Sequence, residues 1–189
     1  MVAISIKTGK IRTKVKVKGA KFLNDVAVGA DGTVYVSDTM GGKIFSMKGG
    51  KASVFAEGEG LESPNGLLVQ DGKLVVAAWG SGLAPDWSTK TPGHLYSLDL
   101  ITKEKKTITA EPLGNLDGIE VDNMANYLVS DWNAGKVFKV SREGKAELLF
   151  YGFKGAADIA FVPGKNLLIV PRMGENLITA FNLSEYPLN

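Results

Sequence analysis

The chain has 189 residues and a mass of 20.1 kDa, which is enough for one domain with a sizeable core and too little for two. Its 22 Lys and Arg residues nearly balance 20 Asp and Glu residues, and the net charge of +2 provides no field that would attract nucleic acid. Cysteine is absent, which excludes disulfides, thiolate nucleophiles and zinc-thiolate sites.

The sequence contains no membrane-spanning segment, because its longest apolar runs, residues 74–79 and 167–170, fall far short of the roughly 18 residues that a span needs. We therefore expect a soluble protein with no membrane partner. The first ten residues, MVAISIKTGK, lack a charged segment followed by a long apolar one, so no signal peptide is visible. A cytoplasmic location and export after loss of an upstream signal both stay open.

Glycine and short β-branched runs dominate the pattern. Glycine supplies 23 of the 189 residues, well above its usual share of about 7%. In the first part of the chain, strands are expected over residues 25–28, 33–37, 43–47 and 52–55, separated by Gly-rich turns. Long helical patterns are missing, so the fold class is predicted to be all-β.

An internal repeat decides the architecture. VSDTMGGKIFSM from Val36 and VSDWNAGKVFKV from Val129 agree at six of twelve positions with an offset of 93, and the same offset carries Asn24 onto Asp117. Units therefore begin near Asn24, Asn65, Asp117 and Ala157, at spacings of 41, 52 and 40 residues. A period near 41 with four strands per unit is typical of a β-propeller blade. A β-sandwich would not explain the repeated motif.

The number of units is too small for a common closed ring. Residues 1–18 are predicted to form the outer hairpin of an incomplete blade, which gives about four and a half blades in one domain over residues 1–189. Propellers close as rings of whole blades, because an open ring exposes strand edges. We expect a truncated six-bladed propeller, a ring completed by self-association with a second chain, or an open arc.

The first position of each unit is predicted to point to the propeller axis. If the inner strand of each blade starts on one face, Asn24, Asn65 and Asp117 converge there. Amide and carboxylate oxygens suit a hard cation, above all Ca²⁺. Each residue could instead serve as a local turn or strand-entry residue, because Asn and Asp bond their own backbone.

The segments FLNDVAV, SPNGLL and LDGIEVD resemble the inner-strand motifs of the senescence marker protein and gluconolactonase family of six-bladed propellers, over essentially the whole chain. The resemblance implies an axial divalent cation, Ca²⁺ or another, held by Asn24, Asn65 and Asp117, with Asp117 as the base or nucleophile in lactone hydrolysis and Asn24 also at the substrate. The cation would polarise the substrate oxygen. The Glu that the family supplies from its first blade has no counterpart, since no acidic residue precedes Asp25.

Four further residues are candidates for contact with a small-molecule substrate. The loop over residues 80–91 is expected to overhang the axial site, and Trp79, His94 and Trp132 lie beside it or on the same face. Arg172 follows a strand and is predicted to meet an anionic substrate. The first hypothesis is a Ca²⁺-dependent lactonase or esterase. The alternatives are a non-catalytic propeller of the NHL type that binds a small ligand or a protein, and a truncated remnant without activity.

Overall fold

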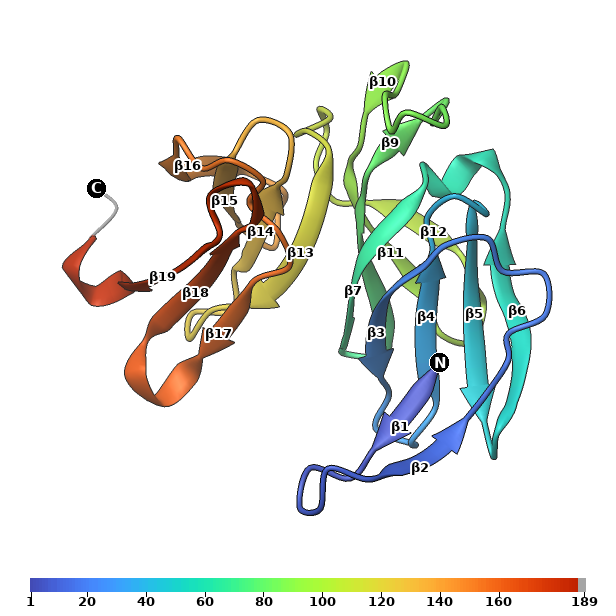
Figure 1. The fold of residues 1–189 in the computed structure, drawn as a ribbon. Coiled ribbons are helices and arrows are strands. Elements are labelled where there is room, and N and C mark those ends of the chain that lie inside the picture. Colours follow the sequence, from blue (N-terminus) through green and yellow to red (C-terminus); the bar gives the residue numbers. More distant parts are fainter. Residues whose placement is uncertain (187–189) are drawn as a thin grey trace.

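The computed structural model describes residues 1–186 and is built from strands and short 3₁₀ turns (Figure 1). Four sheets follow one another around a common axis, as in a propeller, and each begins with its inner strand. Blade one is β3 (Leu23–Val28), β4 (Val34–Asp38), β5 (Lys43–Lys48) and β6 (Lys51–Glu57). Blade two is β7 (Pro64–Gln70), β8 (Lys73–Ala78), β11 (Leu95–Asp99) and β12 (Lys105–Thr107).

The second half of the arc repeats this plan. Blade three is β13 (Leu116–Val121), β14 (Tyr127–Asp131), β15 (Lys136–Val140) and β16 (Ala146–Tyr151). Blade four is β17 (Ala160–Val162), β18 (Leu167–Arg172) and β19 (Leu177–Asn182). Two small hairpins, β1 (Val2–Ile4) with β2 (Ile11–Lys14) and β9 (Gly80–Ser81) with β10 (Thr91–Pro92), stand apart from the blades. The 3₁₀ turns are η1 (Glu59–Leu61), η2 (Pro163–Lys165), η3 (Met173–Glu175) and η4 (Leu183–Glu185).

The prediction of an all-β propeller is therefore confirmed. One detail differs from the expectation of four strands in every unit: blade four has three strands within residues 1–186, because the chain turns into η4 after β19. The hairpin β1–β2 pairs only with itself. Across residues 1–186, none of the helical turns has the length and apolar character of a membrane span.

Apolar contacts between adjacent blades form the core, which is divided into three layers. The layer between blades one and two includes Ile44, Leu74 and Tyr96, each completely buried. The next two layers lie between blades two and three and between blades three and four. A buried Leu or Ile side chain contributes about 1.5–3 kcal/mol, so each layer holds one pair of blades together.

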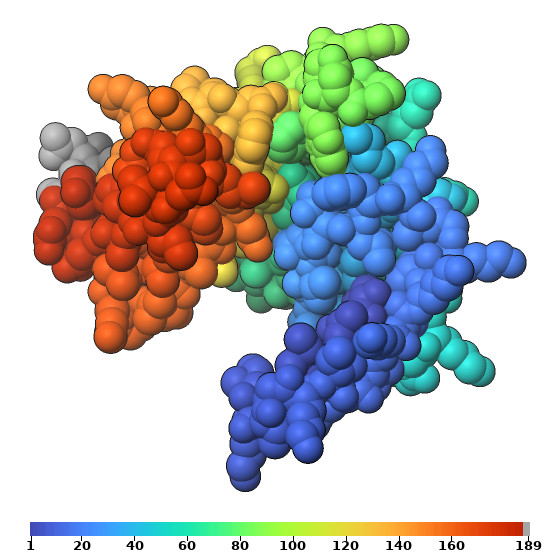
Figure 2. Space-filling model, in the orientation of Figure 1, coloured from blue at the N-terminus to red at the C-terminus, as the bar shows by residue number. Residues whose placement is uncertain are grey.

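Within residues 1–186, each of the two end blades lacks a neighbouring blade on one side. Val26 in blade one is 47% exposed, whereas the equivalent residues of the middle blades, Leu67 and Ile119, are each 4% exposed. At the other end, Ile178 of β19 is 75% exposed. Figure 2 shows the first blade in blue and the last blade in red on opposite sides of a notch. The described residues thus form an open arc.

Candidate functional site

Three side chains from three blades meet at the axis. The amide nitrogen of Asn65 donates to Oδ1 of Asp117 over 2.7 Å, and the amide nitrogen of Asn24 donates to Oδ1 of Asn65. Asn65 is 2% exposed and also donates to the backbone carbonyl of Leu116 over 3.0 Å. The structure therefore brings together the three residues that the repeat phase placed at the axis.

A β-bulge at the start of the inner strand in each of the first three blades aims these side chains inward. The pairing of β3 with β4 shifts register between Leu23 and Val26, and the same shift recurs at the start of β7 and of β13. A bulge leaves one residue outside the ladder and redirects its neighbour. Asn24, like its equivalents Asn65 and Asp117, sits inside the shifted segment, so its side chain leaves the alternation of the strand and points to the axis.

The Ser of each VSD motif holds the bulged backbone. Ser37 accepts a hydrogen bond from the amide of Asp25 over 2.9 Å, and Ser130 accepts one from the amide of Gly118 over 2.8 Å. Ser130 also donates to the carbonyl of Ala157 in the next blade over 2.9 Å. These hydroxyls satisfy buried groups that the bulge removes from the ladder, as buried polar groups require.

The Asp of the same motif caps the loop that enters its blade. Asp38 accepts hydrogen bonds from the amides of Lys21 and Phe22, over 2.9 and 2.6 Å. Asp131 accepts one from the amide of Ala134 over 3.1 Å. Both carboxylates are nearly inaccessible, so they serve the backbone and are not available to a ligand.

Close contact between inner strands explains the glycine that follows two of the axial residues. A Cβ on Gly66 would overlap the carbonyl oxygen of Asp117, and a Cβ on Gly118 would overlap the backbone nitrogen of Ile159. The Asn65-Gly66 and Asp117-Gly118 pairs are therefore not hairpin turns. They let adjacent blades approach one another at the axis.

Aromatic side chains enclose the space above the axial residues. A cavity of about 530 Å³ has Asn24, Asn65 and Asp117 on one side and is walled mainly by Phe22, Trp79, Trp87, Trp132 and Met173. The rings contact one another in series: Phe22 with Trp87 (4.9 Å between centroids), Trp87 with Trp79 (5.6 Å) and Trp79 with Trp132 (6.1 Å). The first two contacts are edge-to-face and the third is tilted, and aromatic contacts of this kind stabilise a pocket wall and favour an apolar ligand group.

The loop between β9 and β10 crosses the mouth of this cavity, as expected for residues 80–91. Trp87 reaches blade one through Phe22, and its carbonyl accepts from the indole nitrogen of Trp79 over 2.9 Å. Asn115 of blade three donates to Thr89 of the loop over 3.1 Å and to the carbonyl of Trp79 over 2.7 Å. We call residues 80–92 the strap, because they are tied to three blades.

Carboxylates near the axis have perturbed pKa values. Burial raises the pKa of Asp117 to about 6, and the charge of Asp25 adds to this while the hydrogen bond from Asn65 opposes it. Removal from water raises the pKa of Asp158 to about 7, with further contributions from Asp25, Asp117 and Glu120. The pKa of Asp25 and that of Glu120 are also raised, chiefly by burial.

Asp25, Glu120 and Asp158 line a separate cavity of about 290 Å³. Asp25 and Asp158 follow the first position of their units, where blades two and three have glycine. Three carboxylates without a basic partner there raise the negative potential at the axis. The sequence signal for this acidic cluster, Asp25, Glu120 and Asp158, was the Asp that directly follows the first position of the first and the last unit.

Two of the proposed substrate residues are placed elsewhere. His94 Nδ1 lies 2.8 Å from Glu62 Oε2, and Glu62 also accepts from Lys105 over 2.6 Å. Arg172 donates to Glu175 through two nitrogens, over 2.8 and 2.6 Å. Neither side chain lines the aromatic cavity, whereas Trp79 and Trp132 both do.

Phe22 and Met173 contribute to the cavity wall without having been proposed from the sequence. Met173 follows β18 at the position that Trp132 holds after β14, and its amide bonds the carbonyl of Gly155 as that of Trp132 bonds the carbonyl of Asn115. The repeat phase therefore contained the signal for Met173. Phe22 reaches the cavity only because Trp87 folds back onto it.

Oxygen atoms suited to a cation are present at the axis, although they come mostly from amides. Over residues 1–186, no group of three or more His, Cys, Asp or Glu side chains is placed to hold a metal ion. The axial set instead offers one carboxylate, of Asp117, and two amide oxygens, of Asn24 and Asn65. Asn24 Oδ1 and the second carboxylate oxygen of Asp117 have no hydrogen-bond partner in the described part of the chain.

The sequence matches no family model and no curated protein. Solved structures with similar folds include a streptogramin B lyase, with a TM-score of 0.70, 15% identity, and coverage of 90% of this chain and 54% of that one. A gluconolactonase from Xanthomonas campestris aligns with a TM-score of 0.67 and 16% identity over 90% of this chain and 61% of that one.

A chain of a nidogen/laminin complex is also similar, with a TM-score of 0.78 and 15% identity over 96% of this chain and 70% of that one. This chain spans little more than half the length of the streptogramin B lyase and of the virginiamycin B lyase from Staphylococcus aureus, of which it covers 57%. At identities of 15–16%, these similarities show a shared fold and nothing more. The chain is thus an all-β propeller arc similar in fold to the gluconolactonase and streptogramin B lyase propellers.

Proposed function

We propose that the chain carries the reaction pocket of a hydrolase that acts on a lactone or related ester and uses a divalent cation, Ca²⁺ above all. The observation that carries this proposal is the hydrogen-bonded series Asn24, Asn65 and Asp117 beneath an aromatic-walled cavity of about 530 Å³. The volume lies within the range of small-molecule sites, and apolar walls around a few convergent polar groups are typical of them.

The donor set fits a hard cation. Asn24, Asn65 and Asp117 would hold it through oxygen atoms, and the cation would polarise the carbonyl oxygen of the ester. Asn65 is anchored by its bond to the Leu116 carbonyl, which fixes its amide and turns Oδ1 toward Asn24. With one carboxylate in the set, affinity for Ca²⁺ is expected to be modest, since affinity follows ligand charge.

Asp117 is the residue proposed to accept or deliver a proton. It is the carboxylate that lines the cavity on the axial side, and the bond from Asn65 orients it. The rings of Trp79 and Trp132 lie on the walls and would hold the apolar part of the substrate beside it. General acid–base catalysis by a positioned carboxylate contributes about 10²- to 10⁴-fold to a rate.

The test combines metal binding with turnover. Ca²⁺ is expected to raise the melting temperature in a concentration-dependent way, because a ligand that binds only the native state stabilises it. Hydrolysis of a panel of lactones and aryl esters should require the cation, and Asp117→Asn should lower kcat by about 10²-fold or more.

Asp86→Asn is the matched control, because Asp86 also lines the cavity but bonds Ser88 in its own loop. It should retain activity close to the parent. Full activity of Asp117→Asn, or a melting temperature indifferent to Ca²⁺, would contradict the proposal. Binding of esters without turnover would favour a binding propeller instead.

A further inference from the structure

The charged residues that line the aromatic cavity are both acidic. Asp117 lies on its axial side, and Asp86 lies in the strap, where its exposed carboxylate accepts from Ser88. Among the described residues, no Lys, Arg or His lines the cavity, although the chain has 22 Lys and Arg residues. The acidic cluster lies close enough to Asp117 for their charges to interact. This imbalance gives the base of the cavity a negative potential, which favours a positively charged ligand.

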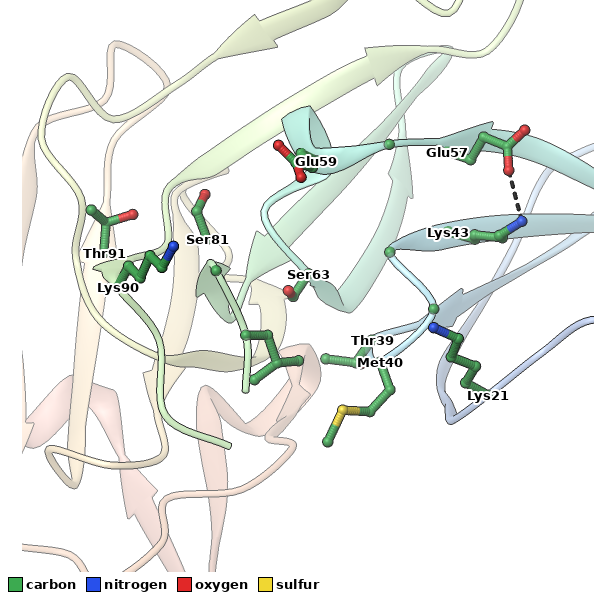
Figure 3. Close-up of a pocket in the computed structure, with 15 residues that line it drawn as sticks. Lys21, Thr39, Met40, Lys43, Glu57, Glu59, Ser63, Ser81, Lys90 and Thr91 are labelled. Carbon is green, nitrogen blue, oxygen red and sulfur yellow. Dashed lines mark hydrogen bonds and ion pairs between the residues drawn. The ribbon is translucent and has the colours of Figure 1, made fainter. Parts of the chain in front are cut away.

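The lysine of the strap lines a different hollow. Figure 3 shows this hollow, of about 860 Å³, with Lys90 and Ser81 on one side and Lys21 on the other. Its lining shares no residue with that of the aromatic cavity. The strap therefore presents Lys90 and Trp87 to different spaces, and no strap cation offsets the acids of the aromatic cavity.

The rings of the cavity wall meet at corners and do not form a flat stack. The planes of Phe22 and Trp87 are inclined by 78°, those of Trp87 and Trp79 by 76°, and those of Trp79 and Trp132 by 48°. Rings inclined in this way face different directions, so a group inside the cavity meets aromatic surface on several sides. All three tryptophans of the chain belong to this wall.

These rings have no cationic partner in the chain itself. Within residues 1–186, Lys or Arg groups lie over the rings of Phe55, Tyr96, Tyr127 and Phe153. None of those four rings lines the cavity. An aromatic face attracts a cation that lies within about 6 Å of its centre, and Trp does so most strongly. The cavity thus gathers the most favourable ring type and leaves it available to a ligand.

Two of the tryptophans are held in place by the protein. Trp79 is 5% exposed, and its indole nitrogen donates to the carbonyl of Trp87 over 2.9 Å. The indole of Trp132 packs on Gly155, where an added Cβ would lie 3.2 Å from the ring. Walls that are fixed before binding lower the entropy lost when a ligand enters.

We infer that the aromatic cavity receives an alkylated ammonium group, held against the rings of Trp79, Trp87 and Trp132. Aromatic walls recognise quaternary ammonium groups through the attraction between the cation and the ring faces. Methylation removes the N–H donors and lowers the cost of taking the cation out of water. A primary ammonium has three N–H donors that require acceptors, and ring walls do not supply them.

This inference rests on the proposed function and deepens it, because it names the substrate as an ester or lactone that carries an alkylated ammonium group. Ca²⁺ at Asn24, Asn65 and Asp117 is compatible with a second cation. Asp117 and the acidic cluster together place four carboxylates near the axis, against the two charges of Ca²⁺. The negative potential there therefore suits both cations.

The experiment uses the intrinsic fluorescence of the full chain, which reports on this cavity because all three tryptophans line it. Titrations in EDTA compare choline with 3,3-dimethylbutanol, its uncharged isostere, and with ethanolamine, which has a primary ammonium. Choline should change the fluorescence saturably and bind at least about fivefold more tightly than either. Equal binding of choline and the isostere would show selection of apolar shape alone. Equal binding of choline and ethanolamine would show no preference for alkylation, and either result would overturn the inference.

Trp87→Leu and Trp132→Leu each remove an aromatic face and keep an apolar side chain. Each should weaken choline binding about fivefold and change binding of the isostere much less, while Phe at the same position should restore part of the loss. Tyr151→Leu is the matched control, because Tyr151 is 76% exposed in blade three and does not line the cavity. Unchanged choline affinity in both Leu variants, at melting temperatures close to the parent's, would overturn the inference.

Failure of this inference and failure of the proposed hydrolysis give different results. If choline binds with the expected selectivity while the parent hydrolyses no ester, acetylcholine included, the ammonium site stands and the hydrolase proposal fails. If esters are hydrolysed but acetylcholine and 3,3-dimethylbutyl acetate have equal kcat/KM and choline does not bind, the hydrolase proposal stands and the ammonium site is wrong.

Discussion

Asn65 and Asp117 are separated by 52 residues, yet the amide of the first donates to the carboxylate of the second over 2.7 Å. This bond joins the inner strands of blades two and three on the axis. It exists because the bulge that contains each residue turns its side chain inward and because glycine follows both. The polar site and the joint between blades are therefore built by the same residues.

Gly118→Ala should destabilise the protein by about 1–3 kcal/mol, since the added Cβ would meet the backbone of Ile159 and Asp158, which cannot move as a side-chain tip can. Urea unfolding measures the change. Gly164→Ala is the control, because its Cβ would meet nothing within 4 Å and its φ is not positive. Equal stability of Gly118→Ala and the parent would show that the inner strands are not closely packed.

Ser130→Ala should cost about 1–3 kcal/mol, because it leaves the buried amide of Gly118 and the carbonyl of Ala157 without their partner. The comparison is Ser53→Ala, which removes an exposed hydroxyl and is expected to change stability by less than about 0.5 kcal/mol. Thermal and urea unfolding should both show that Ser130→Ala loses more stability than Ser53→Ala. A Ser130→Ala variant as stable as Ser53→Ala contradicts the assigned role.

Asp158→Asn should change the pH dependence of stability. The pKa of Asp158 is raised from 3.8 to about 7 in the folded protein, so the folded state binds its proton more tightly than the unfolded state does. The contribution of protonated Asp158 to the free energy of unfolding is complete below pH 4 and is lost as the pH rises toward 7. The variant should therefore show a smaller decline of melting temperature from pH 4 to 8 and exceed the parent at pH 8. Parallel curves would refute this.

Glu62→Gln should destabilise the protein by about 1 kcal/mol at neutral pH. Burial alone would raise the pKa of Glu62, but its bonds from Lys105 and His94 outweigh this and lower the pKa. The stabilisation is present above the ordinary pKa and disappears as the pH falls through the lowered value. The difference between variant and parent should accordingly shrink in acid. A difference that grows in acid would contradict the assignment.

Much of the axial site could be predicted from the sequence. The repeat places Asn24, Asn65 and Asp117 at one phase, and equal phase means equal position in every blade. Trp79 and Trp132 follow from the same logic, because both come directly after the second strand of their blades. His94 shares the general region of the chain, but its ring is turned to Glu62, which lies 32 positions earlier.

The sequence by itself determined the propeller class and the residues that share the axis, because these depend on periodicity and on local turn chemistry. The tertiary structure decided which side chains meet. The aromatic wall forms when the strap packs Trp87 onto Phe22. The acidic cluster forms because Asp25 and Asp158, which come from opposite ends of the arc, meet near the axis. The sequence places Asp25 and Asp158 at one phase of the repeat, but only the long-range packing of the blades and of the strap sets how close these distant charges and rings come.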